Sequence, residues 1–151
     1  MKKNKKLLAV ASAGGHWTQL QLLSQAYTSH DVHFLTTTIN KSTNSSNGKV
    51  SKVMDADSTN KLKLMVVALQ VLVVLLKVRP KVIISTGASP GYFAIVFGKI
   101  MGAKTIWVDS MANNTKLSLS GKHAINSCDL FLTQWPELAD NEKVNYAGRL
   151  L

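Results

Sequence analysis

Two short apolar runs, each followed by a turn that contains glycine, constrain the fold of this chain more than any other feature. Residues 7–11 (LLAVA) precede the turn at 12–15 (SAGG), and residues 82–85 (VIIS) precede a second such turn at 86–91. A short apolar run that ends in turn residues is typical of a strand buried on both faces of a parallel sheet. Glycine lets the backbone of such a turn approach a ligand closely. The two segments therefore predict parallel strands whose following turns form a binding site.

The rest of the chain continues this alternation of strands and helices. Strands are predicted at residues 31–37, 105–108, 130–133 and, as a short last strand, 145–148, and helices at 16–29, 61–79, 92–101 and 117–127. Alternation at this spacing gives a parallel sheet with right-handed crossovers. We therefore predict an α/β fold: a Rossmann-like parallel sheet with helices on both faces, in one domain over residues 1–151.

Residues 40–60 are rich in Ser, Thr, Asn and Lys and contain few large apolar side chains. This composition predicts a long, mobile surface loop. Loops of that length without regular structure are uncommon and are often functional.

The formal net charge of +10 favours an anionic partner, such as a membrane surface or a phosphorylated substrate. Nucleic acid is disfavoured because no zinc-ligand set, recognition-helix signature or RNA-binding aromatic motif is present. The N-terminal lysines and the apolar run after them imitate a signal peptide, but cleavage there would remove the first strand. We therefore expect a cytoplasmic protein. Cys128 is the single cysteine and is expected to be a small buried side chain.

Residues 61–79 (KLKLMVVALQVLVVLLKVR) are apolar on nearly every face of a helix, with Gln70 as the exception within 64–76. The apolar run is shorter than the roughly 20 residues that a transmembrane helix needs. Two interpretations remain. The helix is buried between the sheet and a partner, or it lies in a membrane interface with its flanking lysines and arginine at the headgroups.

In an open parallel sheet, ligands bind beyond the carboxyl ends of the strands. Four predicted loops lie at that edge: residues 12–16, the segment from 36 onwards, 86–91 and 109–114. The dinucleotide fingerprint G-x-G-x-x-G and the Walker lysine loop are both absent. The loops therefore do not predict an NAD or ATP site.

His16 and Asp109 are the candidate acid–base residues of these loops. The helix dipole at a helix N-terminus disfavours a cationic imidazole, which suits His16 to act as a base or hydrogen-bonding group, although it would also suit a capping or packing residue. Asp109 follows a buried strand and fits either an acid–base role or a capping role for the next helix. The other histidines have no partner at metal-ligand spacing, so neither a metal nor a cofactor is expected.

Five segments, SAGGHWTQL, STGASPGYFA, LSLSGK, DLFLTQWPEL and YAGRL, together resemble one family in order and spacing. It comprises bacterial capsule and exopolysaccharide proteins related to the membrane-associated subunit of the two-chain UDP-N-acetylglucosamine transferase. The resemblance implies the N-terminal, acceptor-binding half of a GT-B glycosyltransferase, similar to the enzyme that completes the lipid-linked peptidoglycan precursor. It also implies a separate catalytic partner that carries the UDP-sugar site, so that this subunit is inactive alone.

The resemblance assigns roles residue by residue. His16 and Asp109 would be the catalytic residues, although the peptidoglycan enzyme has glutamate where Asp109 stands and has more glycine in its second loop. The acceptor, a glycan on a polyprenyl diphosphate, would be bound by both turns, through Ser12, Gly14, Gly15, Gly87, Ser89 and Gly91.

The same resemblance places the protein peripherally on the cytoplasmic face of the cell membrane, against an anionic lipid surface. In a GT-B enzyme the end of this half leads towards the other half, so the partner interface is expected at Trp135, Tyr146 and Arg149. The alternative is a non-catalytic membrane adaptor that only recruits and enhances the catalytic partner.

Overall fold

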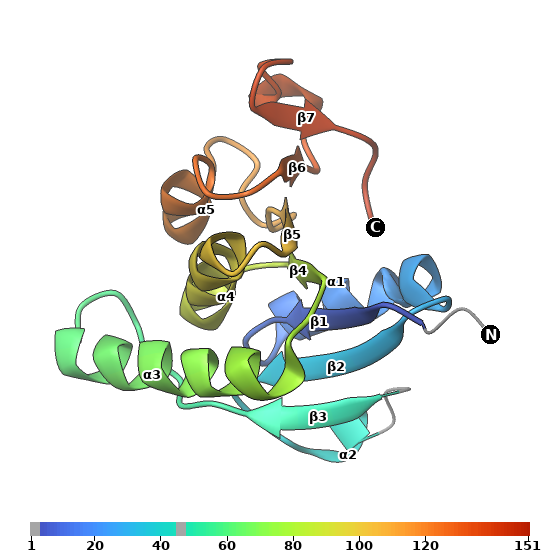
Figure 1. Ribbon diagram of the computed structural model, residues 1–151. Helices are drawn as coiled ribbons and strands as arrows, with labels where there is room; N and C mark the ends of the chain where they lie inside the picture. The colour runs from blue at the N-terminus through green and yellow to red at the C-terminus, as the bar shows by residue number, and fades with distance from the viewer. Residues whose placement is uncertain (1–3, 45–47) are drawn as a thin grey trace.

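Seven parallel strands form a single twisted sheet in the order β3-β2-β1-β4-β5-β6-β7 in the computed structural model, which describes residues 4–44 and 48–151 (Figure 1). Every pairing in this sheet is parallel, as the alternation of apolar runs and helices predicts. The strands are β1 (Lys6–Val10), β2 (Asp31–Thr36), β3 (Lys49–Lys52), β4 (Val82–Ser85), β5 (Lys104–Val108), β6 (Leu130–Thr133) and β7 (Val144–Tyr146).

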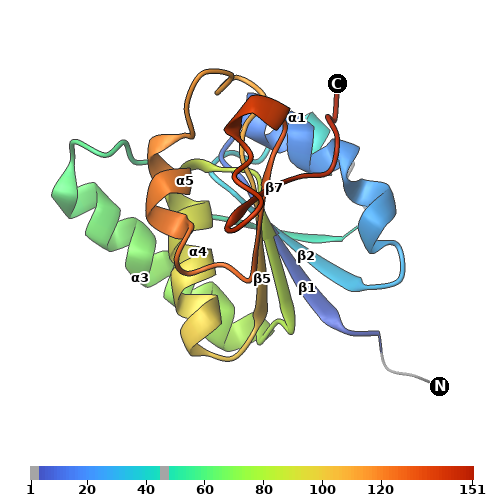
Figure 2. The ribbon, with the colours of Figure 1, turned by 90° about the horizontal axis from the view of Figure 1, so that it is seen from above.

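Helices cover both faces of this sheet, with α3, α4 and α5 on one face and α1 on the other (Figure 2). This arrangement confirms the predicted Rossmann-like fold class. The helices are α1 (Gly15–Leu22), α2 (Lys41–Asn44), α3 (Lys61–Val78), α4 (Ala88–Ile100) and α5 (Leu119–Ala124), with short 3-10 turns at Ser24–Tyr27 and Pro136–Leu138.

Successive residues of the central strands point to opposite faces and build two separate cores. Leu8 and Ile83 belong to the core beneath α3, α4 and α5, in which Trp107 stacks on Phe131 with ring centroids 6.4 Å apart. Leu7 and its neighbours on the other face form a second core with α1. Because both faces are buried, the strands read as continuous apolar runs rather than as alternating ones.

Helix α3 is buried along one stripe and exposed along the opposite one. Val67, Val71 and Leu75 are fully buried in the first core. Gln70, its one interior polar residue, accepts a hydrogen bond from the Met54 backbone N–H at 2.7 Å and so anchors the segment before the helix. The exposed stripe consists of Leu62, Met65, Val66, Leu69, Val73 and Leu76. Within residues 4–44 and 48–151, no helix has both the length and the hydropathy needed to cross a membrane.

The prediction of an unstructured loop over residues 40–60 is wrong in part. Strand β3 pairs in parallel with the edge of β2, and His33 Nε2 lies 2.7 Å from Ser51 Oγ across that pair. The short helix α2 precedes it. An edge strand with lysine at both ends presents little apolar signal, because charged residues protect an exposed edge. Residues 45–47 of the predicted loop lie outside the described residues.

Several predicted boundaries also shift. The first helix ends at Leu22 and is followed by the 3-10 turn, whereas α4 begins at Ala88, four residues before its predicted start. The last strand covers Val144–Tyr146 instead of 145–148. Pro90 falls within the first turn of α4, where its missing N–H has no cost.

The Cys128 thiol is expected to react slowly with alkylating reagents. Burial raises the pKa of this thiol to about 11, and Sγ donates a long hydrogen bond to the Ile125 carbonyl. Because the thiolate is the nucleophile, alkylation by iodoacetamide at pH 8 should be about a hundredfold slower than for free cysteine. Mass spectrometry of timed samples measures this rate. Alkylation of the folded chain at the rate of free cysteine would contradict the packing described here.

Candidate functional site

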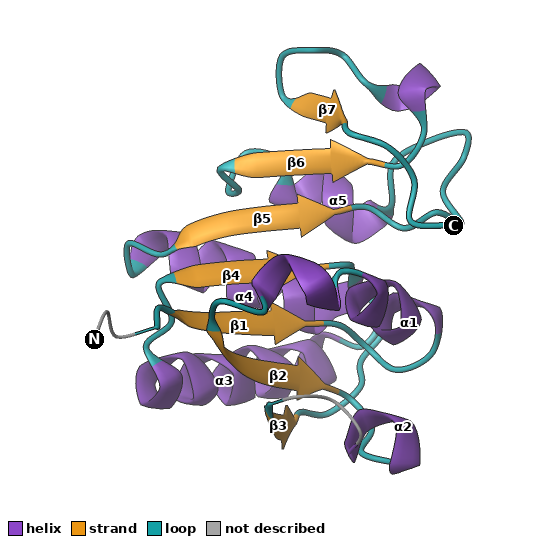
Figure 3. Cartoon of the chain, turned by 90° about the vertical axis from the view of Figure 1, so that its right-hand side faces the viewer, coloured by secondary structure: helices purple, strands orange, loops and turns teal. Residues whose placement is uncertain are grey.

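The loops that follow the strands gather at one edge of the sheet, towards which the arrows of the central strands point (Figure 3). Strands β1 and β4 are neighbours there, but α1 and α4 leave them towards opposite faces. Such a switch point opens a crevice between the two following turns, which is where open α/β sheets bind ligands. The two glycine turns predicted from the sequence are therefore brought together.

His16 joins these two turns. Its Nδ1 lies 2.9 Å from the Thr86 carbonyl oxygen, and the Thr86 hydroxyl donates back to the His16 carbonyl oxygen at 2.6 Å. A carbonyl oxygen can only accept, so Nδ1 carries a proton. In the neutral ring the lone pair therefore sits on Nε2, which is the nitrogen that a base or a hydrogen-bond acceptor would use.

Gly87 packs directly against the His16 ring. A Cβ at Gly87 would lie 2.5 Å from Cε1 and from Nδ1 of His16, and the φ of Gly87 is +139°. The next residue, Ala88, also has a positive φ, +69°, which is uncommon for a residue with a side chain. Backbone strain of this kind is characteristic of functional sites and persists where neighbouring contacts hold it in place.

The first turn, by contrast, is open. An added Cβ at either Gly14 or Gly15 would meet nothing within 4 Å. Ser12 beside them is partly buried, and the Ala13 N–H donates to the Thr37 hydroxyl at 3.0 Å, which ties the loop after β2 to this turn. The open surface lies at the N-terminus of α1, so a ligand can approach the backbone closely there.

Two predicted residues of the second turn have other contacts. A Cβ at Gly91 would lie 1.9 Å from Ser85 Oγ, so the lack of a side chain allows α4 to pack against β4. Ser89 Oγ donates to the Ala56 carbonyl oxygen at 2.9 Å, which fixes the segment before α3 against the start of α4. The geometry thus gives Gly91 a packing role and leaves Gly87 as the glycine of this turn that contacts His16.

Asp109 is buried and fully engaged. Its Oδ1 accepts from Trp107 Nε1 at 2.9 Å and from the Ser118 hydroxyl, and its Oδ2 accepts from the Ser118 N–H at 2.9 Å. Ser118 is the N-cap of α5 and accepts from the Gly121 N–H. Asp109 therefore holds the N-cap residue Ser118 rather than capping the helix itself, and this geometry favours a structural role over acid–base chemistry.

A buried pair of amides, which was not predicted from the sequence, connects the site to the end of the chain. Gln134 Nε2 donates to Gln19 Oε1 at 2.6 Å, and Gln19 Oε1 also accepts from the Met111 N–H at 3.1 Å. Gln134 Oε1 accepts from the Leu150 N–H at 3.1 Å. The pair links α1, the loop after β5 and the C-terminal tail. The polar residue Gln19 on the otherwise apolar face of α1 was the only signal.

The residues predicted for a partner interface lie near this tail. The Arg149 guanidinium lies 4.2 Å above the centre of the Trp135 ring, and Trp135 Nε1 donates to the Met111 carbonyl oxygen at 2.8 Å. Tyr146 is exposed on β7, the edge strand. Trp135 and Arg149 are thus in contact, whereas Tyr146 belongs to the neighbouring sheet edge. Across the part of the chain that the structure describes, no cluster of three or more His, Cys, Asp or Glu side chains could hold a metal ion.

Two solved structures share this architecture. MurG from Acinetobacter baumannii superposes with a TM-score of 0.77 at 10% sequence identity, over 95% of this chain and 45% of MurG. UDP-GlcNAc 2-epimerase from Methanocaldococcus jannaschii superposes with a TM-score of 0.72 at 15% identity, over 95% of this chain and 45% of the epimerase. At these identities the likeness shows the fold alone, and this chain corresponds to about half of each enzyme.

Two fungal proteins are similar in sequence. The UDP-N-acetylglucosamine transferase subunit ALG14 of Yarrowia lipolytica is 34% identical over 82 residues, which is 50% of this chain and 38% of the relative. The corresponding subunit of Schizosaccharomyces pombe is 44% identical over 59 residues, which is 38% of this chain and 27% of the relative. The chain thus matches well under half the length of these curated relatives.

Residues 62–150 match the family described as "Oligosaccharide biosynthesis protein Alg14 like". The matched segment includes the second glycine turn, Asp109, the Gln134-Trp135 pair and most of the C-terminal tail. Because the match covers more than half of the chain, we conclude that this protein belongs to the Alg14-like family of oligosaccharide biosynthesis proteins.

Proposed function

We propose that this chain is the acceptor-binding, membrane-recruiting subunit of a two-chain glycosyltransferase. A catalytic partner holds a UDP-sugar, and the sugar is transferred to a glycan on a polyprenyl diphosphate during capsule or exopolysaccharide assembly. The observation that carries the proposal is the joined pair of glycine turns at the switch point. The fungal relatives, named as subunits of a UDP-N-acetylglucosamine transferase, support the reaction class.

The acceptor diphosphate is proposed to bind between the two turns. The N-termini of α1 and α4 both meet this crevice, and neither helix has an acidic residue in its first turn. Backbone N–H groups and the helix dipoles favour an anion at such a place. Gly14 and Gly15 leave open space for its approach, and Ser12 supplies a hydroxyl group beside the first turn, whereas the Ser89 hydroxyl already donates to the Ala56 carbonyl oxygen.

His16 is proposed to act on the acceptor. As the acceptor hydroxyl attacks the sugar and UDP leaves to the partner's site, Nε2 would take the hydroxyl proton. The contact between Nδ1 and Thr86 holds the ring in the orientation and tautomer that this requires. In the other form of the same proposal the ring carries a proton on both nitrogens, so that Nε2–H donates to the diphosphate and the ring binds rather than takes a proton.

Membrane recruitment is assigned to the exposed stripe of α3. The stripe is apolar, and Lys61, Lys63, Lys77 and Arg79 lie at the two ends of the helix. This combination suits a helix that lies peripherally on the cytoplasmic face of an anionic membrane. The catalytic partner is proposed to dock at Trp135, Tyr146 and Arg149.

Replacing His16 tests the chemical role. His16→Ala is expected to lower sugar transfer, measured with the catalytic partner and a lipid-linked acceptor, by about a hundredfold or more. His16→Asn serves as the matched control, because its amide N–H can still donate to the Thr86 carbonyl while Nε2 is lost. Both variants should lose transfer, and the Asn variant should keep the melting temperature. Transfer that survives in the Asn variant would reduce His16 to a positioning residue.

A non-catalytic adaptor is the second candidate function. The buried, fully engaged carboxylate of Asp109 favours it, because that residue is then unavailable for chemistry. In this case the two glycine turns serve only the structure of the complex. Undiminished transfer by both His16 variants, together with loss of membrane recruitment when α3 is altered, would establish the adaptor function.

A further inference from the structure

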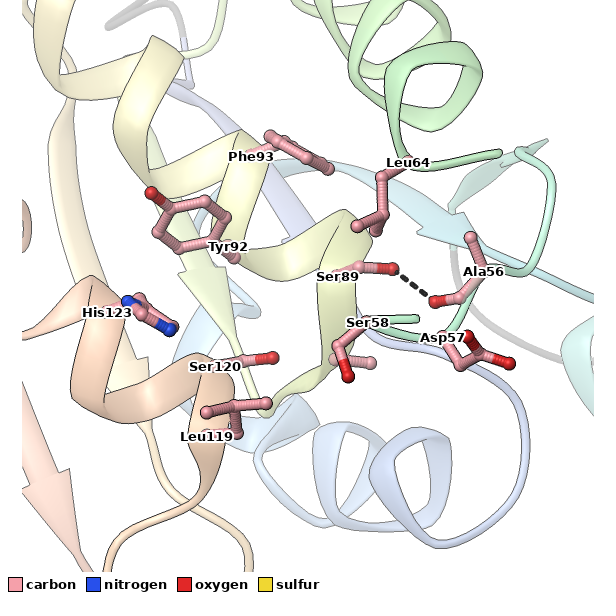
Figure 4. A pocket seen from close by; sticks show the side chains of 11 residues that line it. Ala56, Asp57, Ser58, Leu64, Ser89, Tyr92, Phe93, Leu119, Ser120 and His123 are labelled. Carbon is pink, nitrogen blue, oxygen red and sulfur yellow. Dashed lines mark hydrogen bonds between the residues drawn. The ribbon is translucent and has the colours of Figure 1, made fainter. Parts of the chain in front are cut away.

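A cavity of about 420 Å³ lies beside the second glycine turn, between α3, α4 and α5 (Figure 4). Leu64 reaches it from α3, Tyr92 and Phe93 from α4, and Leu119 from the start of α5. Its size is that of a pocket for a small organic ligand. In the sequence these side chains look like ordinary helix residues, and none of them is predicted to belong to a site.

The walls of this cavity favour a hydrocarbon ligand. Tyr92 and Phe93 are both partly exposed, with ring centroids 5.3 Å apart, and the exposed Leu119 lies at the mouth. Apolar surface of this kind gains free energy when a ligand removes it from water. Polar side chains also line the cavity, namely Asp57, Ser58, Ser89, Ser120 and His123, of which His123 packs edge-on against the Tyr92 ring.

The carboxylate of Asp57, which lines the cavity, disfavours a phosphate group there. Asp57 accepts hydrogen bonds from the Thr59 N–H at 2.9 Å and from the Thr59 hydroxyl. These bonds hold the pKa of the Asp57 carboxyl below its ordinary value, so it is ionised at neutral pH. A diphosphate would be repelled there, whereas an uncharged chain would not.

The position of the cavity connects two parts of the proposed function. Leu64 is flanked on α3 by Met65 of the exposed stripe, and Ala88 in the cavity wall belongs to the second glycine turn. A lipid that is anchored in the bilayer at α3 and has its diphosphate at the turns would pass this place. We infer that the cavity holds the isoprenoid units next to the diphosphate of the acceptor, an inference that rests on the proposed function.

Binding of two soluble probes to the full chain tests this. Geranylgeranyl diphosphate, kept below its micelle concentration, is expected to bind at least about tenfold more tightly than inorganic diphosphate in calorimetry. Ser120→Phe, which fills the cavity from α5, should remove this advantage and leave the affinity for inorganic diphosphate unchanged. Lys122→Phe is the control, because it places the same ring on α5 outside the cavity. Thermal melts should show both variants folded.

Two results would overturn the inference. The first is equal affinity for geranylgeranyl diphosphate in the wild type and in Ser120→Phe. The second is a Ser120→Phe variant that no longer binds the catalytic partner but still binds geranylgeranyl diphosphate with wild-type affinity. The cavity would then hold a segment of that partner. The sugar-transfer assay distinguishes failure of this inference from failure of the proposed function. If sugar transfer to the lipid-linked acceptor persists alongside either result, the proposed function stands and only the proposed role of the cavity is wrong. If the wild-type complex does not transfer sugar, the proposed function itself is wrong.

Discussion

Gly87→Ala is expected to lower the free energy of unfolding by roughly 2 to 5 kcal/mol. Two costs add at this position. The new Cβ would lie 2.5 Å from two atoms of the His16 ring, and a φ of +139° is a conformation that residues with side chains rarely adopt. Chemical denaturation of the isolated chain measures the change. Because His16 must move to admit the methyl group, sugar transfer with the partner should also fall, even under conditions where the variant is folded.

A double-mutant cycle separates these two costs. In a His16→Ala background the clash disappears and the backbone strain alone remains, so Gly87→Ala should be milder there by about 1 to 3 kcal/mol. Gly15→Ala provides the matched control, since an added Cβ at Gly15 meets nothing within 4 Å. It should change stability by less than about 0.5 kcal/mol. If Gly87→Ala cost the same with and without His16, the two turns would not be packed as described.

The parallel sheet was predictable because its central strands are buried on both faces. Residues such as Leu8 and Ile83 on one face and Leu7 on the other give uninterrupted apolar runs, and the glycines after β1 and β4 mark the turns. Strand β3 was missed for the opposite physical reason. It lies at an edge, its ends are lysines, and neither face is deeply buried, so nothing in its composition separates it from a loop.

The site was predictable as a set of loops but not as a set of contacts. His16 and Thr86 are 70 residues apart, and their reciprocal hydrogen bonds depend on β1 and β4 being neighbours. The role of Asp109 was left open because a strand-end carboxylate looks the same in sequence whether it caps a helix or faces a ligand. The cavity depends on the packing of three helices, and its aromatic lining is indistinguishable from core residues in the sequence.

One face of the apolar helix is buried against the sheet, and the opposite apolar face is exposed, so the membrane interpretation stays a prediction for that face. Val67, Val71 and Leu75 pack into the core, while Leu62, Leu69 and their neighbours face outward. A helix with two apolar faces has no polar side to orient it, so the sequence alone left the choice open. The packing against α4 decides which face remains exposed.

The exposed stripe of α3 is expected to dominate membrane binding. Replacing Leu62 and Leu69, which are 77% and 62% exposed, by glutamate should weaken binding to phosphatidylglycerol vesicles by about a hundredfold. Each leucine loses the free energy of burial in the interface, and each new carboxylate is repelled by the anionic surface. Vesicle co-sedimentation measures the change, and both positions are exposed, so the melting temperature should be retained.

The control for this pair must carry the same charge change without touching the stripe. Ile100→Glu with Met101→Glu meets this requirement, because both residues are exposed at the far end of α4. Loss of two units of charge alone should weaken binding in both double variants, and added salt should screen that part of the effect. Any loss of vesicle binding that persists at high salt in the Leu62→Glu, Leu69→Glu variant, and not in the control variant, then measures the insertion of the α3 side chains. Equal losses in the two pairs would mean that charge recruits this protein to the membrane and that the apolar stripe of α3 is covered by something other than lipid.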